Sequence, residues 1–150
     1  MAKLTHDWPR FWIPLGKAVP LDGAGFLRDP ENEYAHFYYS EYQPKLINQL
    51  TELPVAILLG EPGIGKSTVL KEEFLRLQTE GEACLHRELN LYQSDSRFIG
   101  DIFNSEELQA WKQEHYHLTL LLDSLDECRL TIPNVTRILA NKLKGLPTNR

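Results

Sequence analysis

Short apolar runs alternate with helical periodicity along the second half of the chain. Val55–Leu59 and Leu118–Leu122 are apolar runs of strand length, with Thr119 the one interruption, and such runs are typical of strands buried on both faces. Residues 83–91 alternate more loosely and predict a strand between them. Strands separated by helices predict a parallel sheet covered on both faces.

Apolar residues at helical spacing predict four helices around these strands. The first is short, with Pro44 in its first turn. Gly81 and Gly145 follow the second and fourth as helix-ending residues, and Asn104 opens a segment that resembles a capping box before the third. The inward-facing residues are, in chain order, Leu46, Ile47 and Leu50; Val69, Leu70, Phe74 and Leu77; Leu108, Trp111 and His115; and Val135, Ile138, Leu139 and Leu143.

The first third of the chain has a different pattern. Seven of the nine prolines and nine of the fifteen aromatic residues precede residue 63, without periodicity. This aromatic content is too high for a solvated linker. We therefore expect residues 1–52 to form an irregular lead-in that packs on a core, and residues 53–150 to form part of an α/β domain.

Composition limits the class of protein. The 150 residues are 42% hydrophobic and 25% charged with a formal net charge of −5, which is ordinary for a globular domain and unfavourable for wrapping nucleic acid. Cys84 and Cys128 are too few for a disulfide scaffold and are expected to be buried thiols. No secretory leader opens the chain and no apolar run approaches the ~20 residues of a membrane span, so we expect a cytoplasmic protein without a membrane partner.

A glycine-rich segment directly follows the first predicted strand and fits the phosphate-binding pattern G-x-x-x-x-G-K-[ST]. Its glycines permit positive φ angles, and its amide N–H groups at a helix start can surround a phosphate. Lys66 is expected to neutralise the β- and γ-phosphates, Ser67 to bind Mg²⁺ and Thr68 to lie near the α-phosphate. The candidate nucleotide-binding residues are Gly60, Glu61, Pro62, Gly63, Ile64, Gly65, Lys66, Ser67 and Thr68.

A second motif ends the strand over Leu118–Leu122. The strand is followed by Asp123, Ser124, Leu125, Asp126 and Glu127, and a buried strand ending in a carboxylate looks like a Walker B element. Asp123 would hold Mg²⁺, directly or through water, opposite Ser67. Three carboxylates within five residues also favour a nearby cation.

Together the segments GEPGIGKST and LLLDSLDE resemble the NACHT group of STAND signalling NTPases, whose second motif reads D-[GAS]-x-D-E. The resemblance covers about residues 25–147. It implies a three-layer α/β P-loop NTPase fold of the ASCE type with a parallel sheet. It also implies ATP/ADP and Mg²⁺ as ligands, and Asp126 and Glu127 as candidates to orient or activate the attacking water, with Glu127 slightly favoured.

The same family pattern has further parts beyond the motifs. Its sheet holds a fourth strand, ending in a sensor residue, between the first and third strands. The sequence ends at Arg150, where that strand should begin. We therefore expect either a domain cut before the sensor strand or two strands that pair directly.

The resulting expectation is a Mg²⁺-dependent ATP-binding switch module with low turnover in the chain as given. By family analogy, the nucleotide state would control self-oligomerisation or effector and sensor domains, in some members for antiviral defence. An ATPase of the AAA+ class and a non-hydrolysing interaction module remain open alternatives.

Overall fold

The computed structural model describes residues 10–114 and 116–147. It divides into two compact units, Met1–Leu59 and Gly60–Arg150. The first unit is irregular chain with two one-turn helices, α1 (Ala35–Tyr38) and α2 (Ile47–Leu50). Its backbone is tied by two antiparallel bridges, Trp12 with Lys45 and Leu21 with Leu27.

Aromatic side chains supply much of the first unit's packing. Tyr39 is buried and its hydroxyl donates a hydrogen bond to the carbonyl of Arg28. The guanidinium of Arg28 lies 4.1 Å from the centre of the Tyr38 ring, as a cation–π contact. The predicted short helix is present, but it begins at Ile47, because Leu46 is extended with ψ 162°.

The predicted strand over Val55–Leu59 is wrong. These residues form no strand, and Val55, Ile57 and Leu59 are 69%, 75% and 60% exposed. A strand is stable only when a neighbouring strand pairs with its N–H and C=O groups. Within the described residues the sheet consists of two other strands, so the apolar run alone does not define an element.

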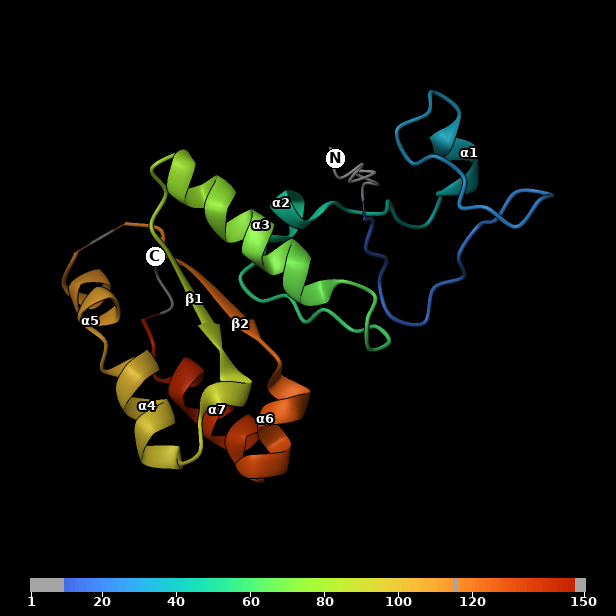
Figure 1. Ribbon diagram of the computed structural model, residues 1–150. Helices are drawn as coiled ribbons and strands as arrows, with labels where there is room; N and C mark the ends of the chain where they lie inside the picture. The colour runs from blue at the N-terminus through green and yellow to red at the C-terminus, as the bar shows by residue number, and fades with distance from the viewer. Residues whose placement is uncertain (1–9, 115, 148–150) are drawn as a thin grey trace, which may run out of the picture. The chain divides into compact units, whose positions relative to one another are not determined.

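The second unit places helices on both faces of a small parallel sheet (Figure 1). The strands pair in register from Cys84 opposite Thr119 to Glu88 opposite Asp123. The unit is therefore mixed α/β with a parallel sheet, as predicted. Its elements are α3 (Lys66–Thr79), β1 (Cys84–Glu88), the 3₁₀ turn η1 (Leu89–Leu91), α4 (Asp95–Phe103), α5 (Glu106–Gln113), β2 (Thr119–Asp123), α6 (Leu125–Thr131) and α7 (Val135–Lys144).

Helix α3 covers one face of the sheet and ends where the sequence predicts. Gly81 has a φ of 78°, and the N–H of Glu82 reaches back to the carbonyl of Leu77 at 2.9 Å, which closes the last turn. On the buried side, the carboxylate of Glu73 accepts two hydrogen bonds from Arg76, at 2.7 and 2.9 Å. This pairing satisfies a charge that is only 2% exposed.

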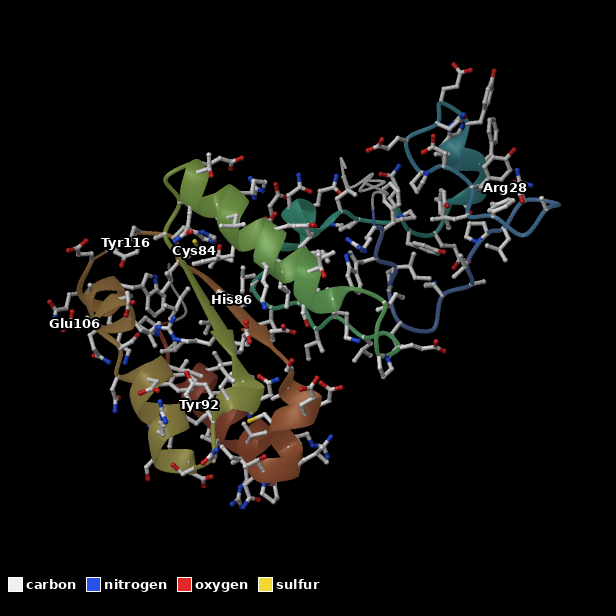
Figure 2. The ribbon with its side chains drawn as sticks, in the orientation of Figure 1. Arg28, Cys84, His86, Tyr92, Glu106 and Tyr116 are labelled. Atoms are coloured by element: carbon white, nitrogen blue, oxygen red, sulfur yellow. The ribbon has the colours of Figure 1, made fainter. Side chains whose placement is uncertain are left out.

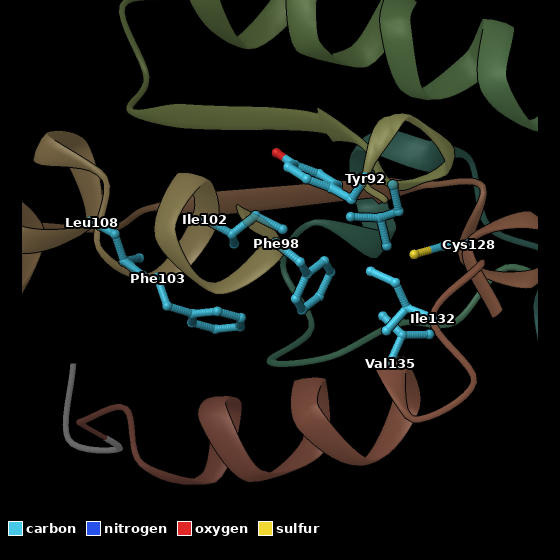
Figure 3. Close-up of a cluster of buried hydrophobic side chains, with 9 residues drawn as sticks. Tyr92, Phe98, Ile102, Phe103, Leu108, Cys128, Ile132 and Val135 are labelled. Carbon is cyan, nitrogen blue, oxygen red and sulfur yellow. The ribbon is translucent and has the colours of Figure 1, made fainter. Parts of the chain in front are cut away.

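The main hydrophobic core lies on the opposite face of the sheet (Figure 3). Phe98 and Ile102 of α4 are fully buried at its centre. Because side chains alternate along β1, its two faces differ: Cys84 and His86 face α3, whereas Arg87 contacts α4. The core residues are Leu89, Tyr92, Phe98, Ile102, Phe103, Leu108, Cys128, Ile132 and Val135.

Several predicted boundaries require correction. The strand predicted over residues 83–91 ends at Glu88 and continues as η1. Helix α5 is capped by Ser105, whose hydroxyl accepts a hydrogen bond from the N–H of Leu108, and Asn104 instead ends α4. Helices α4 and α6 were not predicted. The apolar residues Phe98, Ile102 and Phe103 of α4 stand at helical spacing, whereas α6 is seven residues long with Cys128 as its buried residue.

Two other expectations concern the cysteines and His115. Both cysteines are free thiols; Cys128 is buried and Cys84 half-buried, and burial raises the pKa of each. His115, predicted on the inner face of the third helix, lies outside the described residues. None of the helices in the described part of the chain has the length and apolar character needed to cross a membrane.

Candidate functional site

The glycine-rich segment bends back on itself before α3. Gly63 and Gly65 have φ angles of 82° and 91°, in the left-handed region that favours glycine. At Gly60 a Cβ would lie 3.3 Å from Cγ2 of Ile64, a tight contact that a small shift of the exposed Ile64 side chain would relieve. Left-handed glycines in a loop before a helix are typical of backbone concavities that bind anions. In this loop the N–H of Ile64 donates a hydrogen bond to the carbonyl of Glu61 at 3.4 Å.

The Lys66 ammonium is held by this same loop. Its Nζ donates to the carbonyl oxygens of Gly60 at 2.7 Å and Glu61 at 3.1 Å. Ser67 and Thr68 follow in the first turn of α3 and are exposed. The loop therefore presents a cation, two hydroxyls and a helix N-terminus to solvent.

Asp123 ends β2 and is buried, with 6% of its surface exposed. Its Oδ1 accepts a hydrogen bond from the N–H of Ser124 at 2.8 Å. Ser124 has φ 59° and ψ 40° and is the only non-glycine residue with positive φ in the described part of the chain. A left-handed residue explains physically why a small side chain stands after Asp123.

Replacement of Ser124 by valine is expected to lower the free energy of unfolding by about 1–3 kcal/mol, because a β-branched side chain is strained at positive φ. Ser124→Gly should change it by less than about 0.5 kcal/mol, since relief of strain offsets the greater freedom of the unfolded chain. Urea denaturation of both variants measures the difference. Equal stability of the two variants would contradict the assigned backbone conformation.

Asp126 and Glu127 lie in the first turn of α6 and are exposed. The Glu127 carboxylate is fixed by a long-range contact: its Oε2 accepts a hydrogen bond from Nδ2 of Asn90 at 2.9 Å. Asn90 belongs to η1, which directly follows β1. The two acidic neighbours therefore differ, because a hydrogen bond to a residue 37 positions away orients Glu127.

A polar group between α3 and the sheet was not predicted from the sequence. Lys71 forms an ion pair of 2.7 Å with Glu88, the residue opposite Asp123 in the sheet register. His86 lies two residues earlier on β1 (Figure 2). It packs against Phe74 with ring centroids 5.6 Å apart. Its Nε2 is buried and has no hydrogen-bond partner among the described residues.

Burial lowers the pKa of His86; Asp123 and Glu88 oppose this shift, whereas Lys71 and Arg87 reinforce it. The folded protein therefore binds the proton less tightly than the unfolded chain, whose histidine titrates near pH ~6.5. Stability should fall as pH decreases through that value, because the unfolded state takes up more protons. His86→Phe should remove this part of the pH dependence, measured as the difference in unfolding free energy between pH 8 and ~5.5 for variant and wild type. An unchanged difference would exclude His86 as its source.

The structure brings several of the sequence-predicted residues to one side of the second unit. Helix α3 begins at the side of the sheet where β1 and β2 end (Figure 1). Lys66, Ser67 and Thr68 open that helix, Asp123 ends β2, and Asp126 and Glu127 follow on α6. Lys71 and Glu88 were not predicted as site residues, and their sequence positions indicate such a role only weakly. Lys71 is one turn beyond Ser67, and Glu88 continues the alternation of Cys84 and His86.

The candidate metal-binding residues Ser67 and Asp123 carry oxygen donors. The described residues contain no cluster of three or more His, Cys, Asp or Glu side chains placed to hold a metal ion. Mg²⁺ ordinarily keeps several waters and uses one or two carboxylates together with substrate phosphates. The hydroxyl of Ser67 and the carboxylate of Asp123 are hard oxygen donors of this kind.

An open hollow lies elsewhere in the unit, lined in part by Arg87, Tyr92, Asp101 and Glu107. Arg87 spans it, with Nε 3.4 Å from the carbonyl of Asp101 and Nη2 3.8 Å from Glu107. These contacts satisfy its charge within the protein.

Comparison with protein-family models, curated proteins and solved structures gives no match to the chain.

Proposed function

We propose that the protein is an ATP- and ADP-binding switch module of the NACHT type within the STAND NTPases, with a three-layer P-loop fold. The observation that carries the proposal is the loop over Gly60–Ser67. Its glycines adopt positive φ at Gly63 and Gly65 directly before α3, and its lysine lies folded over the loop carbonyls. Positive φ angles at glycines directly before a helix N-terminus, with a lysine beside the loop, support the proposal that this loop binds phosphate.

In this proposal each residue has a defined task. Lys66 leaves the carbonyls of Gly60 and Glu61 and pairs with the β- and γ-phosphates. Ser67 and Asp123 hold Mg²⁺, which supplies charge neutralisation when bound. Glu127, oriented by Asn90, accepts a proton from the attacking water.

Regulation follows from the same site. A switch of this class changes its association with effector domains, sensor domains or other copies according to the bound nucleotide, and turnover resets it. We propose that this chain works in the cytoplasm and that its nucleotide state governs such contacts, including in antiviral defence. Hydrolysis depends chiefly on positioning, so slow turnover is compatible with tight binding.

The test is a titration of ADP and ATP in the presence of Mg²⁺ with the Lys66→Ala variant. Loss of a charge-assisted contact to phosphate should weaken binding by ~2–3 kcal/mol, roughly 30- to 150-fold. Lys142→Ala is the matched control, because Lys142 is an exposed lysine in the last turn of α7. Equal affinity of wild type and Lys66→Ala, or no binding by wild type, would overturn the proposal.

A further inference from the structure

The ion pair of Lys71 and Glu88 lies beside the residue proposed to hold Mg²⁺. Lys71 is four residues after Ser67 on α3, so the two side chains lie on the same side of that helix. Its Nζ is 2.7 Å from Oε1 of Glu88. Glu88 ends β1 directly opposite Asp123, which ends β2.

Register places the two carboxylates together. Paired residues on neighbouring parallel strands lie ~4.8 Å apart and project to the same face of the sheet. Glu88 faces α3, because it contacts Lys71 of that helix. Asp123 therefore lies on the α3 face as well, paired with Glu88 in the register, and it is buried.

Two neighbouring carboxylates repel each other unless a cation lies close by. Lys71 supplies that cation: its hydrogen bond to Glu88, the charge of Glu88 and, more weakly, the charge of Asp123 raise its pKa. The same hydrogen bond lowers the pKa of Glu88. His86 is another titratable group here; burial lowers its pKa, the charges of Asp123 and Glu88 raise it, and those of Lys71 and Arg87 lower it.

We propose that Lys71 is a built-in counter-cation for Glu88 and Asp123, and that the balance of Lys71 and Glu88 sets how tightly the Asp123 position binds Mg²⁺. The inference rests on the proposed function for its metal site. Lys71 and Glu88 act here as positioning residues that adjust the charge around Asp123. An ion pair that only joined α3 to β1 would support the fold without adjusting metal affinity.

If the ion pair adjusts the metal affinity, loss of Lys71 and loss of Glu88 should change the required Mg²⁺ concentration in opposite directions. Lys71→Met removes a positive charge near the metal, so the Mg²⁺ concentration for half-maximal ADP binding should fall about threefold to tenfold. Glu88→Gln removes a negative charge, so that concentration should rise by a similar factor. The double variant should lie close to wild type, and Lys71→Arg should also keep the wild-type value because it retains the charge.

The experiment is calorimetric ADP binding at increasing MgCl₂ and constant ionic strength, with Lys142→Met as the control for loss of a remote positive charge. Shifts of opposite sign for the two single variants support the inference. Shifts of the same sign, or shifts no larger than that of Lys142→Met, overturn it. The Glu88→Gln and Lys71→Arg variants keep the test decisive where Lys71→Met folds poorly.

A second measurement separates this inference from the proposed function. Thermal unfolding is followed with MgCl₂ and with NaCl of equal ionic strength, without nucleotide. Mg²⁺ should raise the unfolding midpoint of Lys71→Met more than that of wild type, because the two carboxylates lack their counter-cation. If wild type binds no ADP, the proposed function fails, and the inference stands or falls on this difference.

Discussion

Replacement of Phe98 by alanine is expected to lower the free energy of unfolding of the second unit by about 3–5 kcal/mol. Phe98 is 0% exposed and lies among α4, α6 and α7 (Figure 3). Its ring meets that of Tyr92 nearly edge-on, at 5.7 Å and 87°, and that of Phe103 at 6.2 Å. Alanine would forfeit the transfer free energy of the ring, these aromatic contacts and the close packing around the resulting cavity.

This effect is measured by urea denaturation followed by far-ultraviolet circular dichroism, which reports chiefly on the helices. Leu130→Ala is the control, because Leu130 is 87% exposed and should change stability by less than about 0.5 kcal/mol. A unit of this size is stable by only ~5–10 kcal/mol, so Phe98→Leu supplies a milder variant that retains part of the core volume. A Phe98→Ala effect no larger than that of Leu130→Ala would contradict the position of the core.

On the proposed function, replacement of Glu127 by glutamine is expected to lower the rate of ATP hydrolysis about 100-fold or more and to leave nucleotide affinity nearly unchanged. Glutamine keeps the size of the side chain, and its amide oxygen can still accept the hydrogen bond that Asn90 donates to Glu127. What it loses is the capacity to accept a proton from water. The rate should therefore change through the chemical step rather than through binding.

Single-turnover phosphate release and a separate ADP titration distinguish the two quantities. Asp126→Asn is the matched control, since it makes the same charge change one residue earlier on the exposed first turn of α6. A larger loss of rate in Asp126→Asn would assign the base to Asp126. Nucleotide binding without phosphate release by wild type would instead support a non-hydrolysing module.

The ends of helices depend mainly on residues within one helical turn. The bounds of α3 and α7 follow from apolar spacing and from Gly81 and Gly145, which act within one helical turn. The cap of α5 was misplaced by one residue, because Asn104 and Ser105 are both favourable capping residues. In the structure Asn104 ends α4 and Ser105 caps α5.

In the candidate site, features set by neighbouring residues could be predicted, whereas contacts between distant residues could not. The positive φ angles at Gly63 and Gly65 are encoded by the glycines themselves, so the bend of this loop could be predicted from the sequence. The contact of Asn90 with Glu127 spans 37 positions and depends on how η1 lies against α6. No periodic pattern carries such information.

The sequence by itself determined the ends of α3 and α7 and the bend of the glycine-rich loop, because these depend on interactions between residues close in the chain. It also indicated a parallel sheet, because helices separate the predicted strands. Tertiary structure decided which apolar runs became strands. Leu118–Leu122 lies within or beside β2 because β1 pairs with it, whereas Val55–Leu59 forms no strand. Tertiary structure also decided the strand register that pairs Glu88 with Asp123. The ion pair of Glu88 with Lys71 depends in the same way on how α3 packs on the sheet. Pairing partners and charge neighbours are properties of the folded arrangement, and a run of apolar residues does not specify them.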